Sequence, residues 1–579
     1  MKSFLLSLFA LLLLTPPQRT LDDFFNDFTA RWIRNNPNQA VSTRYFSGPE
    51  QDRLEQQLTP ETLEYKKSRI QLAKEGLAEL KKFDRTKLTS EQKVSSDLMQ
   101  WQLEGVVQGE PYLDYTFPLE QFGGANVNLP NALTITHPLR TEKDAVNYLA
   151  RLKQVRLRMD EAIAEARRLA DKGVIPPRFI IQATITQMQT FIGSAPRDNP
   201  FAAIFWEKMS VIQAISSARR EQLRAEAEMV VANDVYPAWM RGITLLQSQL
   251  PRATDDAGLW RLKGGAQAYA YFLRQYTSTS LTPDQIHEMG LQQVAQIEKN
   301  MDAAFRKLGR TQGSINERIA KLRQDLAYPL NDEGRKTIMT DVEQILRDAE
   351  RRSKLLFDKT PKAPVIAQPF PKFREANAAA NYTAPPPDGS RPGIFQIPLR
   401  KERMTKFELR SLVYHETVPG HHFQIALQIE DQMLPRFRQI RAFGGVPGFS
   451  EGWGLYAEHL AAESGWYEND LEGLLGELDS ELFRARRMVV DTGIHAKHWT
   501  RQQAIDYGIE ASEVERYVVY PGQAPSYMLG ELKIIEVREA EKKRLGDGFS
   551  LKKFHNAVFE TGVVPLDMLP QLIQAKLQF

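Results

Sequence analysis

Residues 414–424 read YHETVPGHHFQ and gather three histidines and a glutamate into one short segment. His415 and Glu416 are adjacent, and His421 and His422 follow a few positions later. Neutral imidazoles and carboxylates are zinc ligands, and two imidazoles with one carboxylate leave a position open for water. The residue types are therefore those of a hydrolytic zinc site.

The spacing of the histidines is the difficulty with this interpretation. The usual motif H-E-x-x-H places its histidines at i and i+4, whereas here the step from His415 is i+6 to His421 or i+7 to His422. On an unbroken helix, i+6 points the second ring ~120° away and i+7 moves it ~10.5 Å along the axis. Zinc–nitrogen bonds are only ~2.0–2.1 Å long, so neither spacing works on a regular helix.

Pro419 and Gly420 offer a physical solution. Proline donates no backbone N–H, and its ring collides with the carbonyl four residues earlier, which is that of His415. Glycine tolerates unusual backbone dihedrals. We therefore expect a bulge that loops out about two residues, which restores i+4 and favours His421 as the second ligand. His422 remains the alternative ligand.

The third ligand must come from elsewhere, and the segment GGVPGFSEGWGLYAEHL at residues 444–460 contains candidate carboxylates. Glu451 opens a predicted helix there and is the expected third ligand, with Glu458 as a weaker candidate on the same face. Glu451 could instead be a helix-start carboxylate favoured by the helix dipole. Glu416 is expected to be a general base, because a carboxylate beside a metal can move a proton from water to a leaving group.

A hydrolase of this kind also needs donors aimed at the developing oxyanion. His495 lies in VVDTGIHAKHWT, and Tyr520 and Tyr527 lie in YPGQAPSYMLGE. Six of the nine histidines fall between 415 and 498, which makes the clustering more specific than any single motif. Each of these three residues could equally be part of a packed core.

The elements that position these residues are mostly helical. Residues 141–173 carry an apolar stripe at 3- and 4-residue spacing, with Thr141 as a cap and Gly173 as the end. Two regions differ from this pattern. Residues 107–140 indicate loops with short strands. The proline-rich residues 360–400 indicate short strands near 365–366 and 394–397, and this region either lines a cleft or merely connects to the C-terminal helices.

Length and composition limit the class of protein. The 579 residues are 42% hydrophobic and 25% charged, as in globular proteins of two or three subdomains. The net charge of +3 argues against nucleic acid or an anionic membrane as the main partner. Residues 1–19 resemble a signal peptide, so the mature chain is expected to be exported, periplasmic or secreted, with no integral membrane span. The absence of cysteine excludes disulfides and lipid-modified cysteine, and leaves His, Asp and Glu as metal ligands.

The segments YHETVPGHHFQ, GFSEGWGLYAE, DTGIHAKHWT and YPGQAPSYMLGELKI together resemble the bacterial domain-of-unknown-function family numbered 885, which is grouped with the gluzincin metallopeptidases. The resemblance implies a mainly α, zincin-like fold with a deep central cleft and a small β/loop element near the active site. It also implies an N-terminal helical region at 20–358 and a metallopeptidase-like region at 359–579. Alignment of the Gly-His pair and of PGFSEGWG favours zinc ligands His421 and Glu451. By the same analogy, His495 and Tyr520 or Tyr527 contact the oxyanion.

Three functions fit these observations. The first is an exported zinc peptidase that binds short peptides in a helical cleft, and the second is an esterase or amidase acting on non-peptide small molecules. The third is a non-catalytic binding protein with the same fold, although a binding module has no use for the base Glu416. The sequence does not indicate an oligomeric state.

Overall fold

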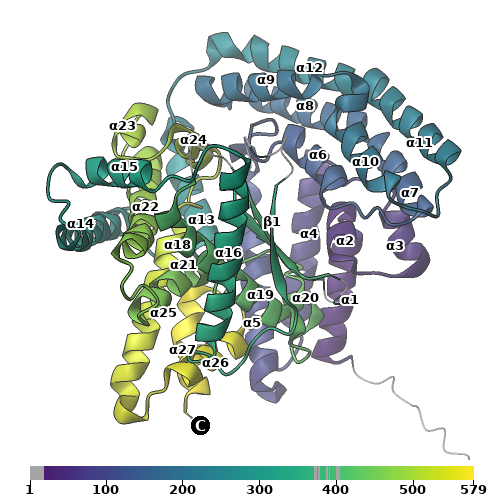
Figure 1. Ribbon diagram of the computed structural model, residues 1–579. Helices are drawn as coiled ribbons and strands as arrows, with labels where there is room; N and C mark the ends of the chain where they lie inside the picture. Colours follow the sequence, from purple (N-terminus) through teal and green to yellow (C-terminus); the bar gives the residue numbers. More distant parts are fainter. Residues whose placement is uncertain are drawn as a thin grey trace, which may run out of the picture.

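A computed structural model describes residues 19–370, 375, 379–386, 389, 391–399 and 404–578. The described chain is mainly α-helical with one small sheet, as predicted (Figure 1). The predicted signal peptide lies outside the described residues except for its last position, residue 19. Among the described residues, no helix combines the length and the apolar character needed to cross a membrane.

The N-terminal helices form one side and the top of the molecule in Figure 1. The first group stands on one side and comprises α1 (Leu21–Arg34), α2 (Pro37–Thr43), α3 (Gly48–Leu54), α4 (Leu63–Leu80) and α5 (Ser90–Gln108). The second group arches over the top and comprises α6 (Ala125–Thr134), α7 (Glu142–Leu152), α8 (Val155–Asp171), α9 (Arg178–Ile192), α10 (Pro200–Ser210), α11 (Ser217–Val230) and α12 (Tyr236–Gln249).

The helix predicted at 141–173 is present but divided in two. Thr141 caps α7 in a capping box with Asp144, and Gly173, with φ of 80°, follows the end of α8 as expected. The chain turns at residues 153–154 between α7 and α8, although the apolar stripe continues across the turn. The apolar periodicity therefore predicted the buried face of residues 141–173 but not the break between α7 and α8.

The strands predicted within residues 107–140 were wrong. A short 3-10 helix covers Glu110–Tyr115, and α6 follows at Ala125–Thr134 with Pro130 inside it. The helix buries Leu129 and Leu133 in the core of the upper helices, so tertiary burial outweighs the local proline and glycine signals.

The C-terminal half surrounds a three-stranded sheet. Its helices before the sheet are α13 (Gly265–Thr277), α14 (Pro283–Lys307), α15 (Ile315–Asp325) and α16 (Asp332–Ser353). After the sheet come α18 (Lys406–Glu416), α19 (His421–Glu430), α20 (Arg436–Gln439), α21 (Pro447–Glu463), α22 (Leu471–Ala496), α23 (Arg501–Asp506), α24 (Ala511–Val519), α25 (Ser526–Leu545), α26 (Leu551–Thr561) and α27 (Leu569–Lys576).

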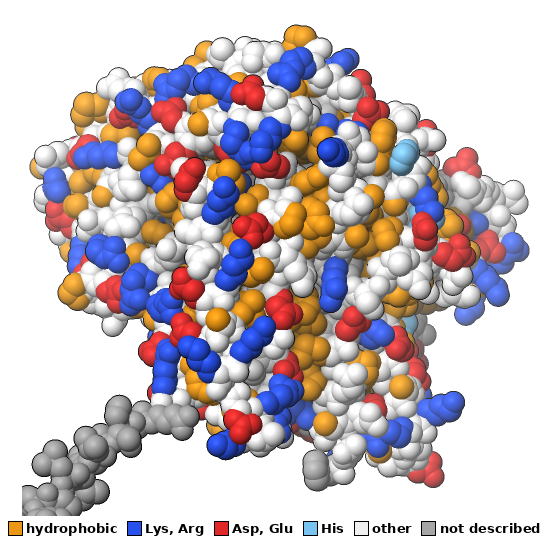
Figure 2. All heavy atoms as spheres, turned by 180° about the vertical axis from the view of Figure 1, so that it is seen from behind, with side chains coloured by type: hydrophobic (Ala, Val, Ile, Leu, Met, Phe, Trp, Pro, Cys, Tyr) orange, Lys and Arg blue, Asp and Glu red, His pale blue; other side chains and the backbone are white. Residues whose placement is uncertain are grey.

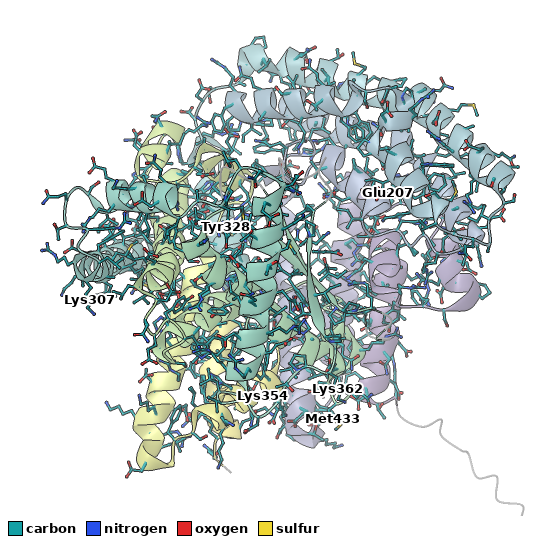
Figure 3. All side chains as sticks on the ribbon, in the orientation of Figure 1. Glu207, Lys307, Tyr328, Lys354, Lys362 and Met433 are labelled. Carbon is teal, nitrogen blue, oxygen red and sulfur yellow. The ribbon has the colours of Figure 1, made fainter. Side chains whose placement is uncertain are left out.

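The sheet has the order β1-β3-β2 and confirms the two predicted strand positions. Its strands are β1 (Val365–Pro369), β2 (Asn381–Thr383) and β3 (Gly393–Ile397). β1 pairs parallel with β3, and β2 pairs antiparallel with β3. Lys354 at the end of α16 and Lys362 just before β1 lie at the same end of the molecule in Figure 3, so the chain reverses direction there.

The core joins the two regions that the sequence analysis separated at residue 358. Phe28 of α1 stacks on Phe443 with ring centroids 5.6 Å apart, and both belong to a hydrophobic cluster that also contains Trp453. The division at 358/359 remains a prediction. Acidic and basic side chains are interspersed on the face shown in Figure 2, in keeping with the small net charge.

Candidate metal centre

The two histidines of the first motif lie on different helices. α18 ends at Glu416 and α19 begins at His421, so the predicted bulge is a complete break between helices. Gly420 N–H donates to the Tyr414 carbonyl at 3.0 Å. A Cβ at Gly420 would lie 2.0 Å from the His415 carbonyl oxygen, so this tight turn requires glycine.

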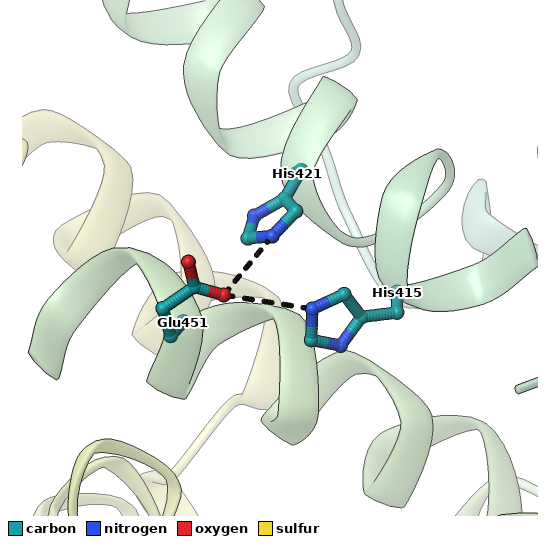
Figure 4. Close-up of side chains that lie close together, drawn as sticks. All are labelled: His415, His421 and Glu451. Atoms are coloured by element: carbon teal, nitrogen blue, oxygen red, sulfur yellow. Dashed lines mark ion pairs between the residues drawn. The ribbon is translucent and has the colours of Figure 1, made fainter. Parts of the chain in front are cut away.

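This break brings His415 and His421 together opposite α21. The two imidazole rings lie 4.7 Å apart between centroids, and Glu451 of α21 faces both (Figure 4). Glu451 Oε2 is 3.3 Å from His421 Nε2 and 3.7 Å from His415 Nε2. The structure thus brings together the three residues predicted to bind the metal.

The donor set fits a tetrahedral zinc ion. Zinc–nitrogen bonds of ~2.05 Å and tetrahedral angles separate neighbouring ligand atoms by about 3.3 Å. The ligand atoms of His415, His421 and Glu451 all lie within 4.8 Å of one another, and two of the separations are 3.3 and 3.7 Å. Three protein ligands leave the fourth position for water or substrate.

Glu458 holds the outer nitrogen of His415. His415 Nδ1 donates to Glu458 Oε1 at 2.7 Å, and Glu458 is completely buried. A carboxylate on the outer nitrogen fixes the tautomer that presents Nε2 to a metal. Glu458, the weaker ligand candidate in the sequence, therefore lies behind the histidine instead of beside Glu451.

Charge interactions within the cluster are strong. Burial alone would lower the pKa of His415, but hydrogen bonds to Glu451 and Glu458 raise it to about 10. Burial alone would raise the pKa of Glu451, but the charge of His421 and hydrogen bonds from both histidines hold it well below its ordinary range. A cation bound here would displace protons from these side chains, because metal ligands bind in their deprotonated forms.

We expect Glu458→Gln to weaken zinc binding at this centre by roughly 10–100-fold, because the charged partner of His415 is lost. Competition against a chromophoric chelator measures this affinity. An unchanged affinity would mean that His415 is oriented without Glu458.

Gly454 makes room for the His415 ring. A Cβ at Gly454 would lie 2.7 Å from His415 Cε1, closer than real Cβ contacts. We expect Gly454→Ala to displace the ring and lower zinc affinity by at least about tenfold, a loss of ~1.4 kcal/mol in binding. Gly445→Ala is the matched control, since a Cβ there meets nothing within 4 Å. Equal affinity in the two variants would contradict this account.

Glu416, the predicted base, is buried beside the three candidate ligands. Glu416 is the last residue of α18, and it is only 8% exposed. Burial raises the pKa of Glu416, while the charges of His421 and His415 lower it. The carboxyl group therefore lies within the electrostatic field of the centre.

His422 faces away from this centre and toward the sheet. Its Nδ1 bonds the Tyr382 hydroxyl of β2 at 2.9 Å, and burial lowers its pKa to about 4. The structure therefore places His421, and not His422, with the other two candidate ligands. Tyr382 was not singled out from the sequence, because a lone tyrosine in a proline-rich stretch carries no spacing signal.

His495 lies in the core with both ring nitrogens occupied. Its Nδ1 accepts from Leu259 N–H at 3.1 Å, and its Nε2 bonds the Tyr517 carbonyl at 3.0 Å. The ring stacks on Tyr269, and burial lowers the pKa of His495 to about 4. No ring nitrogen is left for a substrate oxygen, so this position does not support the predicted oxyanion role.

The two candidate tyrosines occupy different surroundings. The Tyr527 ring lies parallel to His415 at 6.5 Å, and the guanidinium of Arg487 lies 4.5 Å from its centroid. The Tyr520 hydroxyl instead lies against Gly123, where a Cβ would approach it to 1.8 Å. Of the two, Tyr527 is the one whose ring lies next to a candidate ligand.

Solvent reaches the centre although it lies deep in the molecule. The side chains of Glu451 and His421 are 24% and 13% exposed. A separate pocket of about 530 Å³ lies behind the centre, between α15, α18 and α22. Glu458 and Arg484 line this pocket, whereas the three candidate ligands do not.

Comparison with known proteins establishes the family. The family described as "Bacterial protein of unknown function (DUF885)" matches residues 37–573. The chain belongs to this family. No curated protein matches this DUF885 chain.

Two solved structures resemble this DUF885 protein. A candidate lipoprotein from Colwellia psychrerythraea is 30% identical with a TM-score of 0.91, and the match covers 96% of this chain and 99% of that one. A candidate lipoprotein of unknown function from Shewanella oneidensis is 18% identical with a TM-score of 0.71, covering 96% and 100%. The second likeness concerns the fold alone.

Proposed function

We propose that this DUF885 protein is a zinc-dependent hydrolase of the gluzincin type that cleaves short peptides. The observation that carries the proposal is the meeting of His415, His421 and Glu451, with Glu416 buried beside them. Two imidazoles and one carboxylate form the donor set of a hydrolytic zinc site, and the adjacent glutamate supplies the base that such a site needs.

In this proposal, His415, His421 and Glu451 hold the metal. Zinc bound there would supply a Lewis acid that polarises a carbonyl and favours ionisation of water. Glu416 takes the proton from the attacking water and delivers it to the leaving amine, so a single carboxyl group serves as base and then acid. Its burial favours the protonated form that the second transfer requires.

Tyr527 is the proposed donor to the oxyanion. Its ring packs beside His415, and the Arg487 guanidinium over its face favours a polarised phenol. A phenolic donor aimed at the developing charge stabilises it without reorganisation.

We also propose that the protein acts outside the cytoplasm, in the periplasm or the surrounding medium. The apolar run at residues 4–14 and the description of the Colwellia psychrerythraea relative as a candidate lipoprotein support an exported or envelope-associated protein. Because the chain has no cysteine, lipid attachment through cysteine is not part of the proposal.

Metal analysis combined with substrate libraries tests the function. The full chain is treated with a chelator, reloaded with zinc, and incubated with a library of short peptides and a library of esters. We expect peptide cleavage that chelation abolishes and zinc restores. Cleavage of esters alone would favour the esterase alternative, and stoichiometric zinc without any turnover would favour a binding protein.

A further inference from the structure

A second cluster of potential ligands lies on the same helix as Glu451. His459 of α21, Glu481 of α22 and Glu531 of α25 place one ligand atom each within 4.8 Å of one another. His459 Nδ1 is 2.9 Å from Glu481 Oε1 and 3.7 Å from Glu531 Oε1. This nitrogen and both carboxylates therefore converge on one point where three helices meet.

The carboxylate of Glu531 is unsatisfied. Glu531 is 2% exposed, and neither of its oxygens has a hydrogen-bond partner among the described residues. Its neighbours at this point are the carboxyl group of Glu481, which can donate only when protonated, and His459. Buried carboxylates normally pair with donors or coordinate metals. A carboxylate without a hydrogen-bond partner, lying beside two other potential metal ligands, therefore points to a bound cation.

A further carboxylate belongs to the same buried region. Glu477, one turn before Glu481 on α22, is 2% exposed, and its Oε1 has no partner in the described part of the chain. The charges that bear on Glu477 most are those of Glu481, His459 and Glu531. Three buried carboxyl groups thus lie in the same region as one histidine, and a divalent ion would balance their charges once they are ionised.

The outer nitrogen of His459 has the support expected of a metal ligand. His459 Nε2 is 3.1 Å from Glu463 Oε1, and Arg538 holds Glu463 through two contacts of 2.6 and 2.9 Å. This arrangement resembles that of His415 with Glu458, with the roles of the two ring nitrogens exchanged. A carboxylate on the outer nitrogen orients the ring and leaves the inner nitrogen for a metal.

We propose that His459, Glu481 and Glu531 form a second site for a divalent transition-metal ion, with Glu477 as a further carboxylate donor. One imidazole with carboxylates suits zinc or manganese better than calcium or magnesium. The eight-residue step from Glu451 to His459 is about 12 Å along α21, too far for the ~3.5–4 Å spacing of a two-metal catalytic pair. The second ion therefore joins α21, α22 and α25 and holds the helix that carries Glu451.

Metal counting in matched variants tests this site, and zinc and manganese are the probes. The full chain is stripped on a chelating resin, reloaded with either ion, desalted and analysed by mass spectrometry. We expect two equivalents in the wild type, one in Glu531→Gln and in His459→Ala, and one in His421→Ala. The control Glu541→Gln changes a buried glutamate of α25 that pairs with Arg544. We expect this variant to keep two equivalents of metal.

The same variants separate this proposal from the proposed function. If only the first centre binds metal, the wild type holds one equivalent, His421→Ala loses it and Glu531→Gln keeps it, which overturns the second site. If only the second site binds metal, the wild type again holds one equivalent, but now Glu531→Gln loses it and His421→Ala keeps it. The hydrolase proposal then fails instead. Because Glu531→Gln could misfold, anomalous scattering from wild-type crystals at the zinc edge gives an independent location, and the absence of a peak beside His459 overturns the proposal.

Thermal unfolding supplies a further readout. We expect chelation to lower the Tm of His421→Ala, in which the second site alone remains, and to leave the Tm of a His421→Ala, Glu531→Gln double variant unchanged. A Tm of His421→Ala that does not respond to chelation would mean that the carboxylates are held by shared protons, with His459 as their counter-ion.

Discussion

Glu416→Gln is expected to lower peptide hydrolysis by about 10²–10⁴-fold while leaving the zinc content unchanged, because general acid–base catalysis contributes a factor of that size. Glutamine matches glutamate in shape but can neither accept nor return a proton. The side chain is buried beside the ligands without being one of the three that converge. Turnover with zinc-loaded protein, together with metal analysis of the same sample, measures both parts of the prediction.

The control is Glu541→Gln, which removes the charge of a comparably buried glutamate on α25. We expect its turnover to stay within about twofold of the wild type, an effect below ~0.5 kcal/mol. Full activity in Glu416→Gln would exclude Glu416 as the base. Loss of zinc from that variant would instead make Glu416 a ligand.

His421→Ala and His422→Ala are expected to differ sharply although the residues are neighbours. His421 faces Glu451 at 3.3 Å, whereas His422 bonds Tyr382 in the sheet. Removing His421 leaves two ligands, so we expect zinc affinity at this centre to fall by more than the 10–100-fold typical of an outer partner. Turnover should fall below about one hundredth of the wild-type value at limiting zinc.

His422→Ala should keep zinc and activity but lose stability. The hydrogen bond to Tyr382 is partly buried, and its loss is expected to cost about 1 kcal/mol of unfolding free energy. Urea denaturation measures that loss, and chelator competition measures the metal. The opposite pattern, with zinc lost only from His422→Ala, would reassign the second ligand.

Sequence reasoning predicted the central part of the site because a few residues constrain it strongly. Pro419 and Gly420 cannot continue a helix from His415, so the break between the histidines follows from local chemistry. The short strands at β1 and β3 likewise follow from β-branched residues between prolines. These features depend on neighbours in sequence, which a single chain displays.

Features that depend on distant contacts could not be predicted in the same way. His495 belongs to a histidine-rich segment, but both of its ring nitrogens are occupied by Leu259, 236 residues away, and by Tyr517, 22 residues away. The sequence placed Glu458 on the same helical face as Glu451. Whether Glu458 is a candidate ligand or a hydrogen-bond partner of His415 Nδ1 depends on how α18 crosses α21. Helix α6 likewise forms despite its proline, because it buries apolar side chains against residues that are distant in sequence.

The separation of His415 and His421 onto two helices has a consequence for how such sites are recognised and how they diverge. In a one-helix motif the periodicity of the helix dictates the interval, so an insertion that leaves the helix regular moves one ligand off the shared face. Here the interval is set by a turn whose ends are fixed by Tyr414 and by the Trp453 indole, which donates to the Pro419 carbonyl at 2.9 Å. Relatives could therefore lengthen or shorten this turn and keep the candidate ligands together, and a search restricted to the four-residue interval would overlook them.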